Sequence, residues 1–149
     1  MRGAMAEVQL EIPARVDYLV LARQVVAAAA AIEPRFRDER IDDLRVAVSE
    51  ATTNAIEAHA DLSGDERILI RCNLGEDHIE VQVLDSAGGF DPDDVGTAPD
   101  ASDADRLEWE RGLGLPLMRT LADETDIRFT DGGTAVRLVV YTPRHDPTD

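Results

Sequence analysis

The sequence predicts an α+β fold, a two-layer sandwich in which helices cover one face of a mixed β-sheet. The chain has 149 residues, of which 44% are hydrophobic and only 4% aromatic, as expected for one compact domain with an aliphatic core. Apolar residues recur at helical spacing in two long segments, and five shorter segments have the pattern of strands. Because the strands are joined as hairpins while the helices are grouped, we expect one sheet with a single helical layer.

The N-terminal part of the chain is expected to form an edge strand and then a helix. The stretch EVQLEIP alternates apolar and polar residues and ends at Pro13, which is typical of an edge strand. From Ala14 to about Ile32 the apolar residues follow helical spacing, with Arg23 as the exception. Pro34 then stops this helix.

A second helix is predicted from Asp38 to about Ala60. Glu50 and Asn54 lie four residues apart on its flank, so both side chains project from one face of the helix. A carboxylate and an amide therefore converge on one point, although a solvated polar edge is the ordinary alternative. The apolar spacing gives the buried stripe of the helix, which is Ile41, Leu44, Val48, Ala51 and Ala55.

The second half of the chain predicts two hairpins, separated by a long loop and a short helix. RILIRCNL and HIEVQVLD are expected to pair through a turn at GEDH, and ETDIRFT to pair with TAVRLVVYT through DGG. Between the hairpins, residues from about 90 to 111 have no sustained period, which is typical of a functional lid or a disordered loop. GLGLPLMRTLAD then forms the short helix, and residues 143–149 form a frayed tail. We expect residues 1–149 to make a single domain.

The charge distribution excludes several classes of function. The formal net charge is −16, which argues against direct binding of nucleic acid or of an anionic membrane surface. All 15 basic residues are arginine, so a lysine-dependent phosphate loop and Schiff-base chemistry are excluded. No apolar run approaches the roughly 18 residues that span a bilayer, and no secretory signal is visible. The single cysteine, Cys72 in a predicted strand, fits a reducing cytoplasm. We therefore expect a cytoplasmic protein that binds a partner with a basic face.

Four short features follow one another along the chain. The first is the pair Glu50 and Asn54, and the second is VLDSAGGFDP, where a strand ends at Asp85 and continues into glycines. The third is RGLGL at the start of a helix, and the fourth is GGTAVRL, in which Thr134 begins the last strand. Alone, each feature is an ordinary turn, helix start or hairpin.

Together the four features describe a pocket for a nucleotide. Glycines at a helix start let backbone N–H groups approach a phosphate. A carboxylate at a strand end accepts a hydrogen bond from an adenine amino group. An asparagine oxygen suits Mg²⁺, which bridges phosphate oxygens, and a nearby glutamate can deprotonate an attacking hydroxyl.

The ordered set resembles the Bergerat-fold ATPases, a superfamily that includes gyrase and the histidine kinases. Within it, the chain is most similar to the bacterial anti-sigma-factor serine/threonine kinases of the RsbW and SpoIIAB type. LRVAVSEATTNAIEAHA resembles their N box, VLDSAGGFDP and ERGLGLPLMRTLAD their two glycine boxes, and GGTAVRL their terminal threonine strand. The resemblance covers about residues 7 to 141.

The resemblance implies a function, cofactors and partners. The chain would use ATP and Mg²⁺ to phosphorylate a serine or threonine on an anti-sigma-factor antagonist of the STAS type, and would sequester a sigma factor. It would also form a homodimer. Phosphoryl transfer of this kind depends chiefly on positioning and on neutralisation of charge.

The resemblance also implies a role for each candidate residue. Glu50 would be the catalytic base, and Asn54 would bind both Mg²⁺ and the nucleotide. Asp85 would bind the adenine, with Thr134 in support. The lid and phosphate contacts would come from the two glycine boxes, through Gly89, Arg111, Gly112 and Gly114.

Three departures from the family pattern keep other functions open. Ala87 stands where the first glycine box usually has glycine, a change that costs about 1 kcal/mol if this position needs a positive φ. The histidine after the N box is His59 rather than residue 58, and residues 91–110 carry eight acidic side chains, which repel a triphosphate. The alternative is a non-catalytic module that holds a nucleotide and regulates transcription by partner exchange alone. A histidine-kinase catalytic domain is a third hypothesis, and an α+β domain whose polar pairs are solvated surface is a fourth.

Overall fold

The computed structural model describes residues 6–58, 66–86, 115–130 and 133–142, and its elements follow the predicted order. The elements are β1 (Ala6–Pro13), the 3-10 helix η1 (Val16–Tyr18), α1 (Leu19–Ala30), α2 (Asp38–Ala58), β2 (Arg67–Leu74), β3 (His78–Ser86), α4 (Leu115–Leu121), β4 (Glu124–Thr130) and β5 (Gly133–Tyr141). The predicted lid at about 90–111 and the predicted tail at 143–149 lie outside the described residues.

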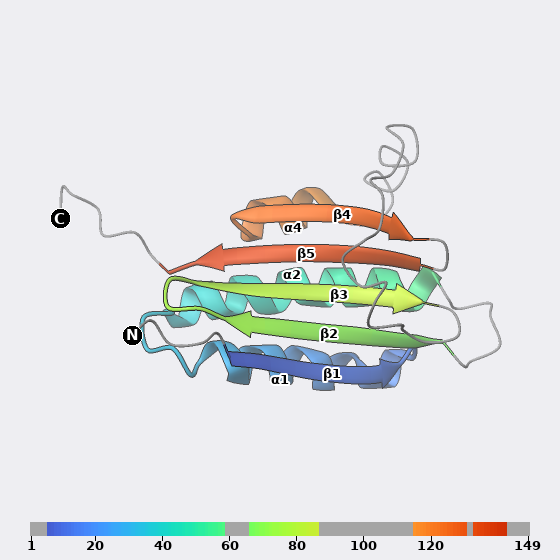
Figure 1. Cartoon of the computed structure of the whole chain (residues 1–149), viewed down its shortest axis with the longest axis horizontal. Helices are drawn as coiled ribbons and strands as arrows, with labels where there is room; N and C mark the ends of the chain where they lie inside the picture. The colour runs from blue at the N-terminus through green and yellow to red at the C-terminus, as the bar shows by residue number, and fades with distance from the viewer. Residues whose placement is uncertain (1–5, 59–65, 87–114, 131–132, 143–149) are drawn as a thin grey trace.

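The five strands form one sheet in the order β1-β2-β3-β5-β4 (Figure 1). Each pair of neighbouring strands is antiparallel, so the prediction of a mixed sheet is wrong for the described strands. The reason is topological. Strands β3 and β4 run in the same direction, but β5 lies between them in the sheet and is antiparallel to both. The α+β class and the single helical layer are confirmed, because all helices cover one face (Figure 1).

The first helix begins later than predicted. Ala14 was expected to start it, but the Ala14 N–H donates to the carbonyl of Glu66 at 3.0 Å, so residue 14 extends the pairing of β1 with β2. Arg15 is also extended, with φ −134° and ψ 140°. The chain turns through η1 before α1 begins at Leu19.

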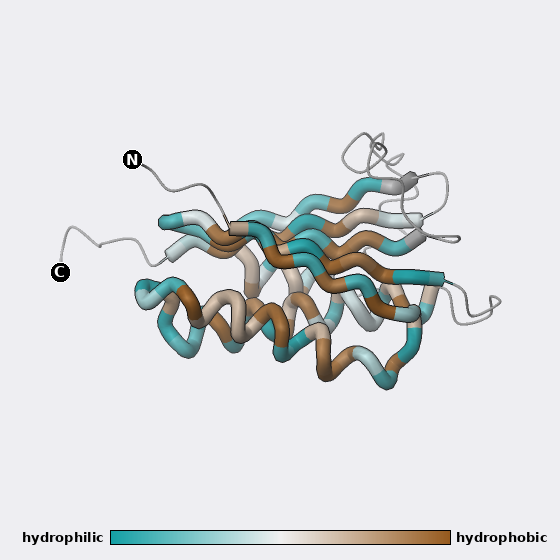
Figure 2. The backbone as a smooth tube through the Cα atoms, turned by 60° about the horizontal axis from the view of Figure 1, so that its bottom comes forward, coloured by the Kyte–Doolittle hydropathy of each residue, from teal (hydrophilic) through white to brown (hydrophobic). Residues whose placement is uncertain are grey.

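The core lies between the sheet and the helices. Hydrophobic and hydrophilic residues alternate along the strands (Figure 2), so one face of each strand is apolar. Every residue of the predicted α2 stripe is buried, which confirms Ile41, Leu44, Val48, Ala51 and Ala55. Cys72 of β2 is buried in the same core, and burial raises the pKa of its thiol to about 11. Cys72 therefore has the setting of a structural rather than a reactive cysteine.

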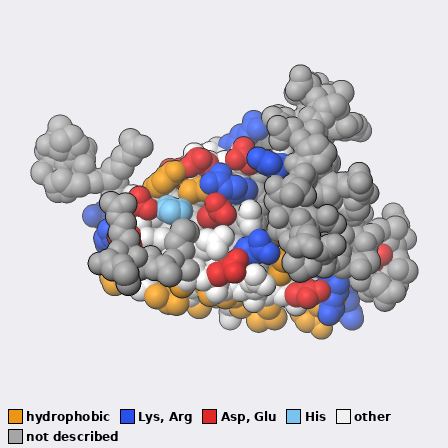
Figure 3. All heavy atoms as spheres, viewed as in Figure 1, with side chains coloured by type: hydrophobic (Ala, Val, Ile, Leu, Met, Phe, Trp, Pro, Cys, Tyr) orange, Lys and Arg blue, Asp and Glu red, His pale blue; other side chains and the backbone are white. Residues whose placement is uncertain are grey.

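The opposite face of the sheet carries charged side chains (Figure 3). Arginines pair with acids on neighbouring strands, as in Arg71 with Glu7 at 3.1 Å and Arg137 with Glu80 at 2.9 Å. Such partly exposed pairs stabilise a fold only slightly. Most buried apolar residues of the sheet lie on its helical side, where they form the core. No helix of the described chain is long and apolar enough to cross a membrane.

Candidate functional site

The buried polar residues gather at one end of the molecule. Among the described residues, five polar or charged side chains are buried, namely Thr52, Asn54, Glu66, Asp85 and Thr134. They come from the C-terminal half of α2, the residue before β2, the end of β3 and the start of β5, which lie at the same end of the sheet (Figure 1). Burial of polar groups is costly unless they are paired, so their concentration at one end marks a candidate site.

Asp85 and Thr134 face each other across β3 and β5. Their Cα atoms are register partners, and Asp85 is also the partner of Ile68, a fully buried core residue. Because directly opposed residues share a face, both side chains lie on the helical side of the sheet. The backbone N–H of Thr134 donates to Oδ1 of Asp85 at 3.2 Å. The predicted pair is therefore brought together, and this hydrogen bond orients the carboxylate.

Gly133 allows β5 to approach Asp85 closely. A Cβ atom at position 133 would lie 1.7 Å from the backbone oxygen of Asp85 and 2.9 Å from its Oδ1. Any side chain at this position would thus displace β5 from β3 at the point where the Asp85 carboxylate is held. Sequence analysis missed this role because GGT was interpreted as an ordinary turn. The usable signal was a glycine directly before the strand threonine.

Glu50 and Asn54 lie one turn apart on one flank of α2, a helix that contacts α4. Asn54 is buried, and Glu50, one turn earlier, is half-buried. Arg40 lies on the same flank at helical spacing, and its Nη2 is 2.7 Å from Oδ2 of Asp123, just after α4. The helix also contacts β3 and β5, the strands that carry Asp85 and Thr134. Four predicted residues from distant segments are therefore brought to one end of the molecule.

Glu66 is a buried acid that sequence analysis did not single out. It is 5% exposed and directly precedes β2 at the same end of the sheet as Asp85. No sequence signal marks it, because an acid before a strand is common in turns. The remaining predicted site residues, Gly89, Arg111, Gly112 and Gly114, lie outside the described residues, as do Ala87 and His59.

The side chains at this end fit a magnesium nucleotide. Asn54 offers a buried amide oxygen, and Asp85 offers a carboxylate that the N–H of Thr134 holds as an acceptor. Within the described ranges, no cluster of three or more His, Cys, Asp or Glu could hold a metal. Magnesium does not require such a cluster, because it binds through one or two protein oxygens together with phosphates and waters.

Comparisons with known proteins agree with the fold. Residues 12–140 match the family described as histidine kinase-like ATPase domain. The chain is 35% identical to the serine-protein kinase RsbW of Bacillus pumilus, over 95% of this chain and 91% of that protein. It is also 35% identical to RsbW of Bacillus subtilis, over 95% of this chain and 89% of the relative. The identity to the anti-sigma F factor of Caldanaerobacter subterraneus is 40%, over 83% of this chain and 85% of the relative.

A solved structure shows the same fold. The crystal structure of the RsbU and RsbW domains of Rv1364c from Mycobacterium tuberculosis matches with a TM-score of 0.66 and 19% sequence identity. The match covers 93% of this chain and 33% of that longer chain. At this identity the likeness concerns the fold alone. The family match implies that the chain binds ATP. The chain thus belongs to the histidine kinase-like ATPase family and, within it, to the RsbW-like anti-sigma-factor serine kinases.

Proposed function

We propose that this chain transfers the γ-phosphoryl group of ATP to a serine or threonine of a STAS-type anti-sigma-factor antagonist, and that it sequesters a sigma factor. The observation that carries this proposal is the hydrogen bond from Thr134 N–H to Asp85, at the sheet end where the α2 flank with Glu50 and Asn54 also lies. Relatives of similar length are named serine-protein kinase RsbW and anti-sigma F factor.

The adenine base is recognised by a hydrogen-bond acceptor of the protein that matches the donor on the base. Asp85 accepts a hydrogen bond from the adenine amino group, and its orientation by Thr134 N–H supports this role. Guanine has a carbonyl oxygen at the same place, so an acceptor at Asp85 favours ATP over GTP. By the family resemblance, the phosphates would bind to Arg111 and to the backbone at Gly112 and Gly114, and Gly89 would belong to the lid; all four lie outside the described residues.

The transfer step depends on Glu50 and Asn54. The carboxylate of Glu50 takes the proton of the attacking hydroxyl while the hydroxyl oxygen bonds to the γ-phosphorus and ADP leaves. The half-buried position of Glu50 supports this role, because a carboxylate in partial contact with solvent can later release the proton. Asn54 holds Mg²⁺ through its amide oxygen. When bound, Mg²⁺ neutralises the charge that develops on the phosphate oxygens.

In the proposed function, the chain acts in the cytoplasm and binds either the sigma factor or the antagonist. The net charge of −16 supports a partner with a basic face rather than direct contact with DNA. We also propose that two copies form a homodimer, an expectation that rests on the family resemblance. Measurement of the molar mass by light scattering tests it.

A transfer assay tests the proposed kinase activity. The purified chain is incubated with γ-labelled ATP, Mg²⁺ and the antagonist, and label on the antagonist is measured. Label is expected with the wild type and lost with Glu50→Ala. Glu57→Ala, an exposed acid on the same helix, is the matched control that keeps activity. Replacement of the acceptor serine or threonine by alanine must abolish the label.

The same assay separates the kinase from the non-catalytic module. The sequence features that favour the module are Ala87 and the eight acidic residues between 91 and 110. A chain that binds ATP with Mg²⁺ but transfers no label, while still binding its sigma factor, supports the module and contradicts the kinase.

A further inference from the structure

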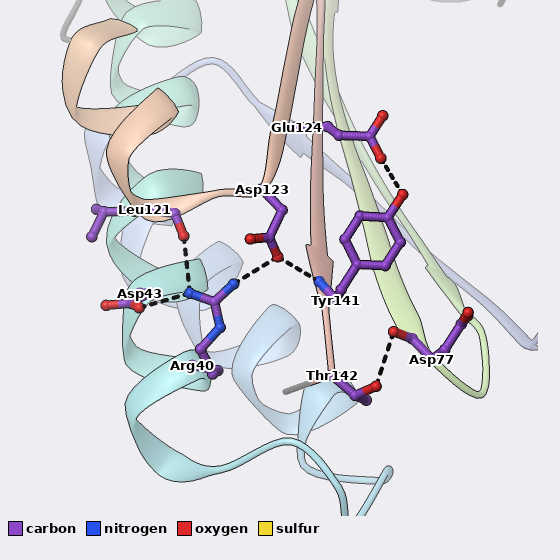
Figure 4. A network of polar contacts seen from close by, with 8 residues as sticks. All are labelled: Arg40, Asp43, Asp77, Leu121, Asp123, Glu124, Tyr141 and Thr142. Carbon is purple, nitrogen blue, oxygen red and sulfur yellow. Dashed lines mark hydrogen bonds and ion pairs between the residues drawn. The ribbon is translucent and has the colours of Figure 1, made fainter. Parts of the chain in front are cut away.

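Arg40 connects α2 to the end of α4, at the opposite end of the molecule from the candidate site. Its Nη2 lies 2.7 Å from Oδ2 of Asp123, and its Nη1 lies 3.1 Å from Oδ2 of Asp43 (Figure 4). The same Nη1 also points to the carbonyl oxygen of Leu121 at 3.5 Å, the outer limit of a hydrogen bond. One guanidinium therefore binds its own helix and the last residue of α4, together with the turn that follows.

Asp123 in turn connects this contact to the sheet. Its backbone N–H donates to the carbonyl of Val139 at 2.8 Å, and its Oδ2 accepts the N–H of Tyr141 at 2.7 Å (Figure 4). The oxygen that binds Arg40 is thus fixed by β5. Because Asp123 is hydrogen-bonded to β5, its contact with Arg40 holds the start of α2 at a set position relative to the α4–β4 turn.

The short helix α4 packs against the core through few of its described side chains. Among its side chains that the structure describes, Met118 is the one that is fully buried, and Leu121 is partly buried. Leu117 on the outer surface is 42% exposed. A methionine side chain is flexible and tolerates shifts of its surroundings. The contacts of Arg40 with Leu121 and Asp123 are directional contacts between α2 and the C-terminal end of α4.

The helix dipole does not favour a cation at position 40. The first turn of a helix favours negative charge, which Asp38 and Glu39 supply in α2. A cation in this turn opposes the helix dipole. Within α2, Arg40 has a favourable i,i+3 pair with Asp43, and its other contacts reach Asp123 and Leu121 outside the helix.

We propose that Arg40 is a positioning residue, which sets the placement of α4 against α2 and thereby the affinity for nucleotide. The inference rests on the proposed function, since Glu50 and Asn54 lie further along the flank of α2 that Arg40 fixes against α4. Loss of the guanidinium lets α4 shift relative to this flank. Residues remote from a ligand change its binding in this way when they fix the elements that hold it.

Nucleotide titration of the full chain tests the inference. The affinity for a non-hydrolysable ATP analogue with Mg²⁺ is measured by calorimetry at a temperature where each variant is folded. Arg40→Ala is expected to weaken binding about tenfold. Arg40→Lys keeps the charge but not the two-nitrogen contact, so it should recover part of the loss. Arg15→Ala, which removes an exposed pair with Asp17, is the matched control with unchanged affinity.

Two further measurements separate positioning from simple stability. In a double-mutant cycle, Asp123→Asn should weaken binding little in the Arg40→Ala background, because the two residues act through one contact. Hydrogen exchange without nucleotide should become faster in Leu115–Leu121 of Arg40→Ala, with β2 and β3 unchanged. If Arg40→Ala fails to fold, the same titration is made with Asp123→Asn. This variant should fold, since its amide oxygen still accepts the Tyr141 N–H.

The outcomes distinguish this inference from the proposed function. A folded Arg40→Ala or Asp123→Asn variant that binds the analogue as the wild type does overturns the positioning role only. Unchanged exchange in α4 of Arg40→Ala also overturns it. A wild-type chain that binds no analogue overturns the proposed function, whatever the exchange in α4 shows.

Discussion

The polar side chains at the two ends of α2 differ in how far they are exposed to solvent. At its C-terminal end, the side chains of Asn54, Asp85 and Thr134 are polar yet buried. At its N-terminal end, Arg40 and Asp123 are charged and partly exposed, and they bind each other, the backbone and neighbouring acids (Figure 4). The first end buries polar groups at an energetic cost, which is typical of a site that acts on a ligand. The second end keeps its charges in contact with water, and its hydrogen bonds connect α2, the turn after α4 and β5. We therefore expect changes at the first end to act on the ligand directly, and changes at the second to act through the placement of the helices.

The largest effect is expected from Glu50→Gln. The amide keeps the size of the side chain but cannot accept the proton of the attacking hydroxyl, so the rate of phosphoryl transfer should fall by about 10²- to 10⁴-fold. Nucleotide affinity should stay unchanged, since Glu50 does not bind the nucleotide in the proposed site. Single-turnover transfer and calorimetry measure the two quantities. Equal transfer rates in Glu50→Gln and in the exposed control Glu57→Gln would remove Glu50 from the mechanism.

Asn54→Ala should act on metal-dependent binding. Loss of the amide oxygen is expected to lower the affinity for the magnesium nucleotide by about 10- to 100-fold, with a smaller change when Mg²⁺ is absent. Asn73→Ala is the matched control, because Asn73 lies on the charged face of the sheet and donates to Glu80 at 3.3 Å. A loss of affinity that is the same with and without Mg²⁺ would contradict a role as metal ligand.

The same substitution, glycine to alanine, can be made at both ends of the sheet and its cost in unfolding free energy compared. Gly133→Ala places a Cβ 1.7 Å from the backbone of Asp85, so we expect a loss of about 3 kcal/mol in unfolding free energy and weaker ATP binding. Gly75→Ala, at the other end, brings a Cβ to 2.8 Å from the ring of His78, which can rotate away. Its cost should be about 1 kcal/mol, with ATP binding unchanged. Denaturant unfolding and calorimetry measure both. Equal costs for the two variants would show that β5 tolerates displacement at Asp85.

These contrasts explain which features could be predicted from the sequence. The pair Glu50 and Asn54 was found because the chemistry needs two residue types at one helical spacing, and Asp85 and Thr134 because each marks a strand end. The Arg40 contact with Asp123 joins residues 83 positions apart, and the two residues belong to no motif. Gly133 was missed because its role depends on how closely β5 approaches the backbone of Asp85. The mixed sheet was wrong because the insertion of β5 between β3 and β4 is a property of topology, which hydrophobic pattern does not encode.

A smaller effect is expected from two hydroxyl groups. Thr52 Oγ1 is fully buried in α2 and has no hydrogen-bond partner among the described residues, so Thr52→Val should raise the unfolding free energy by about 1 kcal/mol. At the other end, the hydroxyl of Thr142 donates to the carbonyl of Asp77 at 3.1 Å, and Thr142→Val should lower stability by about 0.5–1 kcal/mol. Denaturant unfolding measures both changes in unfolding free energy, which should have opposite signs. A destabilised Thr52→Val would mean that its hydroxyl is satisfied by a buried water.

The smallest effect concerns the ionisation of Tyr141 at the exposed end. Its hydroxyl donates to the carboxylate of Glu124 (Figure 4), and this hydrogen bond raises the pKa of Tyr141 above its ordinary value of 10. Because the pKa is raised in the folded state, the associated stability is fully present below pH 10 and is lost as the pH rises through the folded pKa. Glu124→Gln should move the tyrosine titration to lower pH, measured by tyrosinate absorbance in a Tyr18→Phe background. Nucleotide binding should not change, since the pair lies at the end of the sheet away from Asp85. If the titration midpoint stays the same, solvent rather than Glu124 controls this hydroxyl. In that case the exposed end is held by Arg40 and the backbone contacts of Asp123 without help from the Tyr141 ring.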